Sequence, residues 1–224
     1  MKSPTHLIRV VLPGLALGAL FFSGCQSVYY DTMEKFGVHK RDILVERVEE
    51  AKDSQEEAKE QFASALEEFL SVTEYKGGDL QAKYEDLSSE LEKSEAQARD
   101  VRDRINSIES VAEALFEEWG DELSQYSNPS LRASSEKQLT ATRDRYDRLM
   151  VVMRKAESGM DPVLDAFRDQ VLFLKHNLNA RALASLEETS VGLQEDINDL
   201  IRQMEGSIAE ASAFIEAMRE AESG

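Results

Sequence analysis

The sequence predicts an all-α protein that folds as an elongated antiparallel four-helix bundle with coiled-coil character. The composition favours helices: the 224 residues include only 4 prolines, 11 glycines and 7% aromatic residues, while 31% are charged. Apolar residues recur three and four positions apart through four long blocks, which is the periodicity of helices that pack by heptads. Turn-forming residues separate the blocks, and no segment has the alternating pattern of a strand.

The first two predicted helices cover residues 30–76 and 80–126, with Gly77 and Gly78 between them. The apolar stripe of the second keeps a regular phase, which favours a left-handed supercoil. Ser127 or Asn128, followed by Pro129, ends this helix and begins the next, because proline suits the first helical position. The two stripes are Leu44, Val48, Ala51, Ala58, Phe62, Ala65, Phe69 and Val72, then Leu80, Tyr84, Leu87, Leu91, Ser94, Ala98, Val101, Ile105, Ile108, Ala112, Leu115 and Trp119.

The third and fourth predicted helices cover residues 130–176 and 181–221, with a turn at residues 177–179. Asp161 and Pro162 have the composition of a helix start, but the heptad phase survives across them, so we expect a kink within one helix. Short turns make consecutive helices antiparallel, and helices of about 45 residues give a rod of about 65–70 Å. The fourth stripe is Leu183, Leu186, Leu193, Ile197, Leu200, Met204, Ile208, Ala211, Ile215 and Met218.

Residues 1–24 are predicted to be a lipoprotein signal peptide. Residues 1–9 contain Lys2 and Arg9 and no acidic residue, and an apolar run of thirteen residues follows from Val10 to Phe22. This run corresponds to about 20 Å of helix, which is too short for a hydrocarbon core of about 30 Å. A transmembrane anchor is therefore disfavoured.

The end of this segment, Ser23-Gly24-Cys25, resembles the bacterial lipobox, whose cysteine becomes the acylated first residue of the mature chain. Phe22 stands where leucine is usual. The resemblance implies a diacylglyceryl group and an amide-linked acyl chain such as palmitate on Cys25, which give stable attachment facing the periplasm. Gln26, where an aspartate would imply inner-membrane retention, favours the outer membrane. Residues 25–29 are then a lipidated tether, and residues 30–222 form the bundle.

The charge and the motif content disfavour several functional classes. A formal net charge of −18 disfavours nucleic acid as a partner, because that binding needs basic residues against phosphates. A single cysteine excludes a disulfide framework, and neither His39 nor His176 has a Glu or Asp three residues before it, as an E-x-x-H metal site would. The sequence has no phosphate-binding loop and no recognisable nucleophile motif. We expect no cofactor, no metal and no enzyme activity, with an unrecognised active site as the third-ranked reading.

The third helix contains the main basic stretch of the chain: Arg143, Arg145, Arg148, Arg154 and Lys155. These side chains are expected to flank the helix seam and to pair with acidic neighbouring helices, as heptad e and g residues do. A surface for an anionic ligand is the alternative. Trp119 is expected in the core or at a bundle end.

Residues 29–42 are predicted to be a membrane-proximal or partner contact. They begin four residues beyond Cys25 and combine tyrosine rings, which suit a membrane interface, with a small basic cluster. The alternative is that Phe36 and Val38 cap the end of the bundle. The candidate contact residues are Tyr29, Tyr30, Lys35, His39, Lys40 and Arg41.

Two stretches carry a resemblance to a known family: YYDTMEKFGVHKRDILVERVEEAKDSQEEAKEQF at residues 29–62 and VLFLKHNLNARALASL at residues 171–186. They resemble bacterial lipoproteins of unknown function that consist of long acidic helices, and the likeness covers nearly the whole mature chain. Members are sometimes labelled DNA-repair ATPases, but this sequence has no nucleotide-binding motif. The resemblance implies no established activity.

Together these features predict a membrane-anchored periplasmic scaffold or adaptor without catalytic activity. The chain would be attached to the membrane through Cys25 and would bind an envelope protein. A lipid-surface or envelope-shaping protein is the alternative, which the acidity disfavours because anionic headgroups repel it. A homo-oligomer is also compatible with the sequence, because apolar heptad residues left outside the bundle core could pair two chains.

Overall fold

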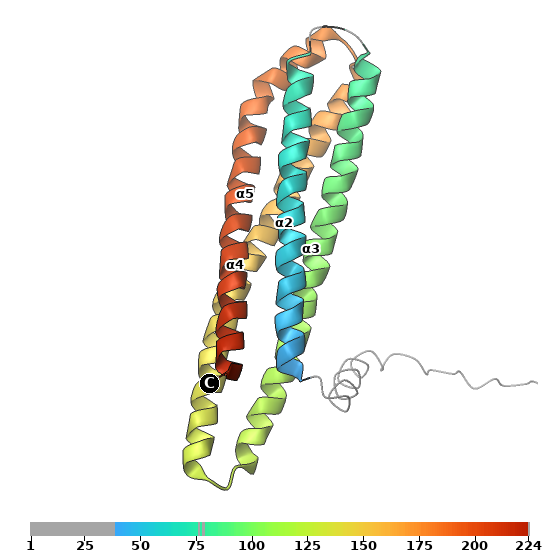
Figure 1. Cartoon of the computed structure of the whole chain (residues 1–224). Helices are drawn as coiled ribbons and strands as arrows, with labels where there is room; N and C mark the ends of the chain where they lie inside the picture. The colour runs from blue at the N-terminus through green and yellow to red at the C-terminus, as the bar shows by residue number, and fades with distance from the viewer. Residues whose placement is uncertain (1–38, 76, 78, 224) are drawn as a thin grey trace, which may run out of the picture.

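The structure, a computed structural model, describes residues 39–75, 77 and 79–223 as four long helices (Figure 1). Helix α2 runs from Lys40 to Thr73, α3 from Leu80 to Glu122, α4 from Pro129 to His176 and α5 from Ala180 to Ser223. A short 3₁₀ helix, η1, covers Leu123–Gln125. The described residues contain no strand, so the predicted all-α four-helix bundle is confirmed. The predicted start of the first helix, at residue 30, lies outside the described residues.

Local sequence signals place the helix ends. Asp79 caps α3, because its Oδ1 accepts hydrogen bonds from the backbone N–H groups of Gln81 (3.0 Å) and Ala82 (3.2 Å). Asn128 caps α4 in the same way, with Pro129 in the first turn. Of the two residues that the sequence offered for this cap, the structure selects Asn128.

Helix α4 continues through Pro162, as the unbroken heptad phase predicted. Because α4 is continuous here, Asp161 caps no new helix. Its carboxylate instead accepts hydrogen bonds from Nη2 of Arg102 on α3 at 3.0 and 3.1 Å. Gly159 lies against α5, where an added Cβ would be 3.2 Å from Cδ1 of Leu200. The absence of a side chain at this position lets α4 and α5 approach closely.

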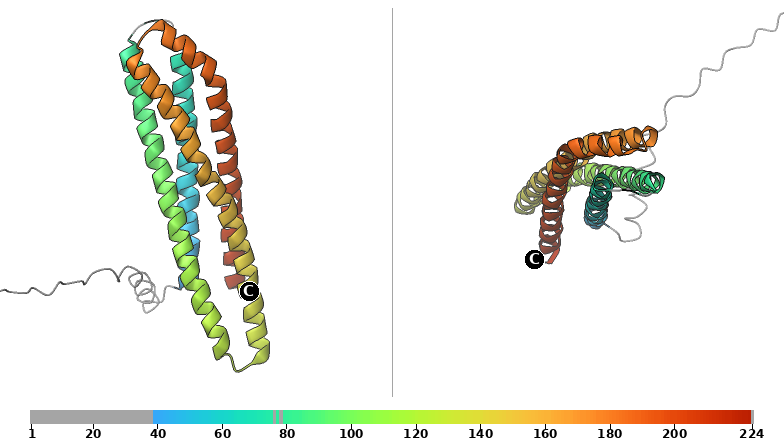
Figure 2. Two further views of the ribbon diagram at one scale, coloured as in Figure 1. Left: turned by 180° about the vertical axis from the view of Figure 1, so that it is seen from behind. Right: turned by 90° about the horizontal axis from the view of Figure 1, so that it is seen from above.

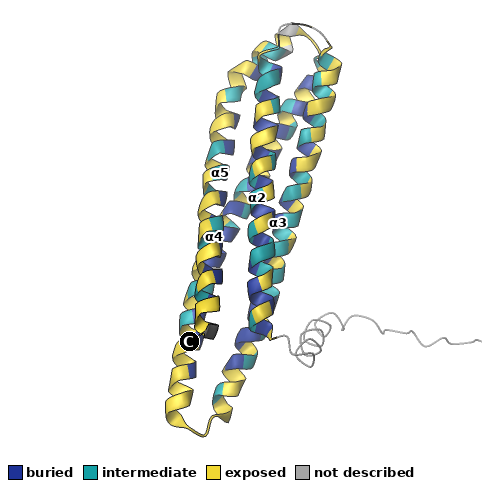
Figure 3. Ribbon diagram, in the orientation of Figure 1, coloured by how far each residue is buried: buried dark blue, intermediate teal, exposed yellow. Residues whose placement is uncertain are grey.

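The bundle has two different ends, which we call the near end and the far end (Figure 1). The near end contains the start of α2, the end of α5 and the α3–α4 turn, and the far end contains the α2–α3 and α4–α5 turns. At the near end the α3–α4 hairpin extends beyond the start of α2 and the end of α5, which both side views show (Figures 1 and 2). The tip of this hairpin is mostly exposed (Figure 3).

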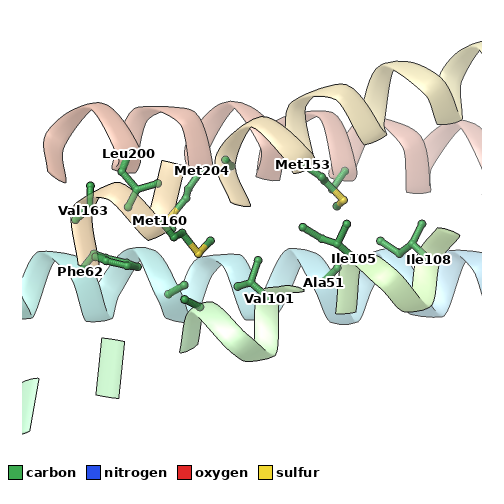
Figure 4. Close-up of a cluster of buried hydrophobic side chains, with 14 of the residues drawn as sticks. Ala51, Phe62, Val101, Ile105, Ile108, Met153, Met160, Val163, Leu200 and Met204 are labelled. Atoms are coloured by element: carbon green, nitrogen blue, oxygen red, sulfur yellow. The ribbon is translucent and has the colours of Figure 1, made fainter. Parts of the chain in front are cut away.

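The core runs through the bundle as one cluster, and all four helices contribute to it (Figure 4). It is wider than the predicted stripes, because residues flanking them, such as Val111, Leu164 and Phe214, are also buried. Ile208 of the predicted fourth stripe is half-buried and packs against the core, while its neighbour Ser207 is fully buried. Gln55, which the predicted stripe omits, is also fully buried. Both residues are polar, but their positions in the heptad repeat place them in the core of the bundle.

Ion pairs fasten the helices to one another around this core. Arg154 on α4 pairs with Glu109 on α3, and Arg148 pairs more loosely with Glu210 on α5 at 3.9 Å. Arg143 donates a hydrogen bond to the backbone oxygen of Phe116 (3.1 Å) and lies over its ring. Arg148 and Arg154 therefore pair with acidic residues of neighbouring helices, as the heptad pattern predicted, whereas Arg143 contacts α3 through a backbone oxygen and a ring.

Glu157 occupies the centre of the α3–α4 ion pairs. Its carboxylate accepts hydrogen bonds from Nε of Arg102 (2.8 Å) and from Nη1 of Arg154 (3.0 Å). Burial alone would raise the pKa of Glu157, but the two guanidinium groups outweigh burial and hold the pKa below its ordinary value of 4.5.

We expect the bundle to lose stability in acid partly through Glu157. Because the folded-state pKa is lowered, the stabilisation is fully present above the unfolded pKa, about 4.5, and disappears as pH falls through the folded pKa. Urea titrations across pH 6 to 3 should therefore show a shallower loss of stability for Glu157→Gln than for the wild type. Glu113→Gln is the control, since Glu113 is exposed and has no ion pair among the described residues. Equal slopes for the wild type and Glu157→Gln would contradict this prediction.

Candidate functional site at the near end

The predicted contact segment reaches the described part of the protein at the near end. Cys25, Tyr29, Tyr30 and Lys35 lie outside the described residues, so their predicted roles stay predictions. His39, Lys40 and Arg41 form the start of α2, with His39 as the residue that precedes the helix. The structure brings these three residues beside the α3–α4 hairpin.

Lys40 and Arg41 both contact α3. Lys40 is only 5% exposed, and its Nζ lies 2.9 Å from Oε2 of Glu118. The guanidinium carbon of Arg41 lies 4.8 Å from the ring centroid of Trp119, which is the geometry of a cation–π contact. Both basic side chains therefore help to hold the first turn of α2 against α3.

Trp119 joins the two helices of the hairpin. It is buried, as the sequence predicted, and its Nε1 donates a hydrogen bond to Oγ of Ser135 on α4 at 2.8 Å. A buried indole N–H needs such a partner, because an unpaired polar group in the core is costly. Ser135 is not among the residues predicted from the sequence, although it lies four residues before the buried Leu139, which is a heptad spacing.

A pocket of about 580 Å³ lies where the start of α2 meets the hairpin. Its walls include His39, Arg41, Trp119, Tyr126 and Gln138. These side chains offer an aromatic surface, hydrogen-bonding groups and positive charge, and Asp42, Glu118 and Glu122 add negative charge to the walls. Tyr126 and Leu131, farther along the hairpin, are 42% and 56% exposed. Groups of these kinds can make apolar, hydrogen-bonding and ionic contacts with a bound molecule.

Two further observations concern the described residues alone. None of their helices has a stretch long and apolar enough to span a membrane. They also contain no group of three or more histidine, cysteine, aspartate or glutamate residues that could hold a metal ion.

Reversing both charges at the start of α2, in Lys40→Glu/Arg41→Glu, should destabilise the near end. If these residues served only as external contacts, the exchange would spare stability. The structure instead places a new carboxylate beside Glu118 and removes the cation from Trp119, so we expect a loss of about 1–3 kcal/mol in the free energy of unfolding. Urea titration of Arg132→Glu/Lys137→Glu, the same charge change at exposed positions of α4, provides the control. Equal stability of both double variants would refute the structural role.

Comparison with known protein families identifies the family to which this chain belongs. A family model described as a protein of unknown function, DUF2959, matches residues 29–218. The match begins ahead of α2 and extends through nearly all of α5. The curated proteins contain no match to the chain. The chain therefore belongs to the DUF2959 family, whose function is unknown.

Proposed function

We propose that the chain is a membrane-anchored scaffold or adaptor of the bacterial cell envelope without catalytic activity. A lipid on Cys25 attaches it to the membrane, preferentially the outer membrane, and the bundle projects into the periplasm. The observation that carries the proposal is the position of α2, whose first residue lies at the near end of the bundle, fifteen residues after Cys25. If the chain is attached to the membrane through the segment before α2, the sides and the far end of the bundle are free to bind a partner.

The fold supports this role in two further ways. Four helices that share one core and are joined by interhelical ion pairs make a stiff body, and stiffness suits a spacer between a membrane and a partner. The strong net negative charge of −18 favours a bundle that stands away from anionic headgroups over one that lies along them.

The test is the location of Cys25→Ser in fractionated cells. The wild type should be recovered with membranes, whereas Cys25→Ser should appear in the soluble periplasm or as an uncut precursor, because it has no thiol to acylate. Gln26→Asp is the matched variant: it retains the cysteine, should stay membrane-bound, and should shift towards the inner membrane. Recovery of Cys25→Ser in the membrane fraction as a fully processed, acylated chain would refute the proposal.

A further inference from the structure

A groove lies at the far end between the end of α2, the start of α3 and the start of α5. Figure 1 shows that these three helix ends meet there. This far-end groove encloses about 970 Å³, a volume that can take several side chains of a bound peptide. Leu70, Glu74, Leu80, Leu178, Leu183 and Glu187 are among the residues that line it.

The apolar part of the far-end groove is incompletely covered. Leu70, Leu80 and Leu183 pack against the core but remain half-buried, and Leu178 in the α4–α5 turn is 40% exposed. Single exposed apolar residues are ordinary, but a group with a polar rim is typical of an interaction site. Four of the seven large hydrophobic residues that the described chain exposes belong to this end, and Leu178 is the one that lines the groove; the others are Leu172, Phe173 and Val191.

The described part of the groove has acidic charge. Among the described residues that line it, Glu74 and Glu187 are the charged ones, and both are exposed. Neither carboxylate has an ion-pair or hydrogen-bond partner among the described residues. Lys175, His176 and Arg181 belong to the same end but do not line the groove. A positively charged occupant would therefore meet two exposed carboxylates that pair with none of the described residues.

We propose that the far-end groove docks an amphipathic segment of a partner protein, one that presents both leucine-like side chains and lysine or arginine side chains. The apolar side chains would cover the exposed leucines, and the cations would pair with Glu74 and Glu187. A second copy of this chain, or an anionic lipid surface, would instead bring negative charge against these carboxylates.

This inference rests on the proposed adaptor function, because it identifies the surface with which the adaptor would bind its partner. Helix α5 has 44 residues and so spans about 66 Å, which places the groove at the opposite end of the bundle from the tether. The binding test below does not depend on whether the cell acylates Cys25, so failure of one proposal is distinguishable from failure of the other.

The probe is a fluorescein-labelled peptide of about four helical turns (~14 residues) with leucines on one face and lysines on the other. Its anisotropy is measured against the full chain as purified from cells in a mild non-ionic detergent, acylated or not, and the signal in detergent alone is subtracted. We expect saturable binding by the wild type, and a Kd raised about tenfold or more in Glu74→Lys/Glu187→Lys. Leu178→Ser, at an exposed position, should also weaken binding without lowering the melting temperature.

The matched control is Glu60→Lys/Glu113→Lys, which makes the same charge change at exposed positions outside the groove. Its Kd should stay within about threefold of the wild type. If both double variants raised the Kd of the peptide equally, the effect would come from the net charge of the protein and not from the groove, and the proposal would be overturned. Absence of binding by the wild type, or equally tight binding of a leucine–glutamate peptide, would overturn it as well. Capture of the chain by phosphatidylglycerol vesicles that Leu178→Ser abolishes would assign the groove to a lipid surface instead.

Discussion

Replacing Phe167 with alanine is expected to lower the free energy of unfolding by about 3–5 kcal/mol, the usual cost of emptying an aromatic site in a core. Phe167 on α4 is 1% exposed, and its ring meets that of Phe69 on α2 edge to face, with centroids 6.2 Å apart. The contact joins two helices that are not consecutive in the chain. Its loss would therefore weaken the packing of the whole bundle.

Urea titration followed by circular dichroism measures this effect. Leu172→Ala is the control, since Leu172 belongs to the same helix but is 48% exposed, and we expect it to cost no more than about 0.5 kcal/mol. If Phe167→Ala were as stable as Leu172→Ala, the helices could not be packed in the observed register.

Replacing Gln55 with methionine should have the opposite sign and stabilise the bundle by about 1–3 kcal/mol. Gln55 is fully buried on α2, and neither its Nε2 nor its Oε1 has a hydrogen-bond partner among the described residues. Its amide therefore loses hydration on folding without compensation. Methionine has a similar length and no such group, so it keeps the packing and avoids this cost.

Gln61→Met provides the matched control for Gln55→Met. Gln61 belongs to the same helix, but its Nε2 donates to Oε2 of Glu90 at 2.7 Å, so its replacement should destabilise the protein. The two substitutions should thus shift the urea midpoint in opposite directions. A lower midpoint for Gln55→Met would show that the buried amide is stabilised in the native bundle, contrary to our account.

The sequence predicts most of this fold because heptad spacing, turn residues and capping residues all act locally. The four helices, the Asn128–Pro129 start of α4 and its passage through Pro162 follow from such signals. Gln55 and Ser207 could not be placed from composition, since a polar residue on a stripe becomes buried only when neighbouring helices close over it. The partners of Arg102 likewise depend on how far α3 and α4 slide past each other.

The candidate sites are less predictable, since both arise where helix ends meet. The sequence picked out Lys40 and Arg41, but their contacts with Glu118 and Trp119 join positions far apart in the chain. The far-end groove is formed by three helix ends, and no single segment contains a motif for it. Leu80 and Leu183 belong to the predicted stripes, so the sequence alone does not show that the turns leave them only half-buried.

Mass spectrometry of the N-terminal peptide from membrane-derived protein tests the central claim, attachment by one end of the bundle, most directly. Our account predicts that the mature chain begins at Cys25 and that this residue carries a diacylglyceryl group and an amide-linked acyl chain. The near end would then lie next to the membrane, with the far-end groove away from it. A mature chain that retains Met1, or one in which Cys25 is unmodified, would contradict the account.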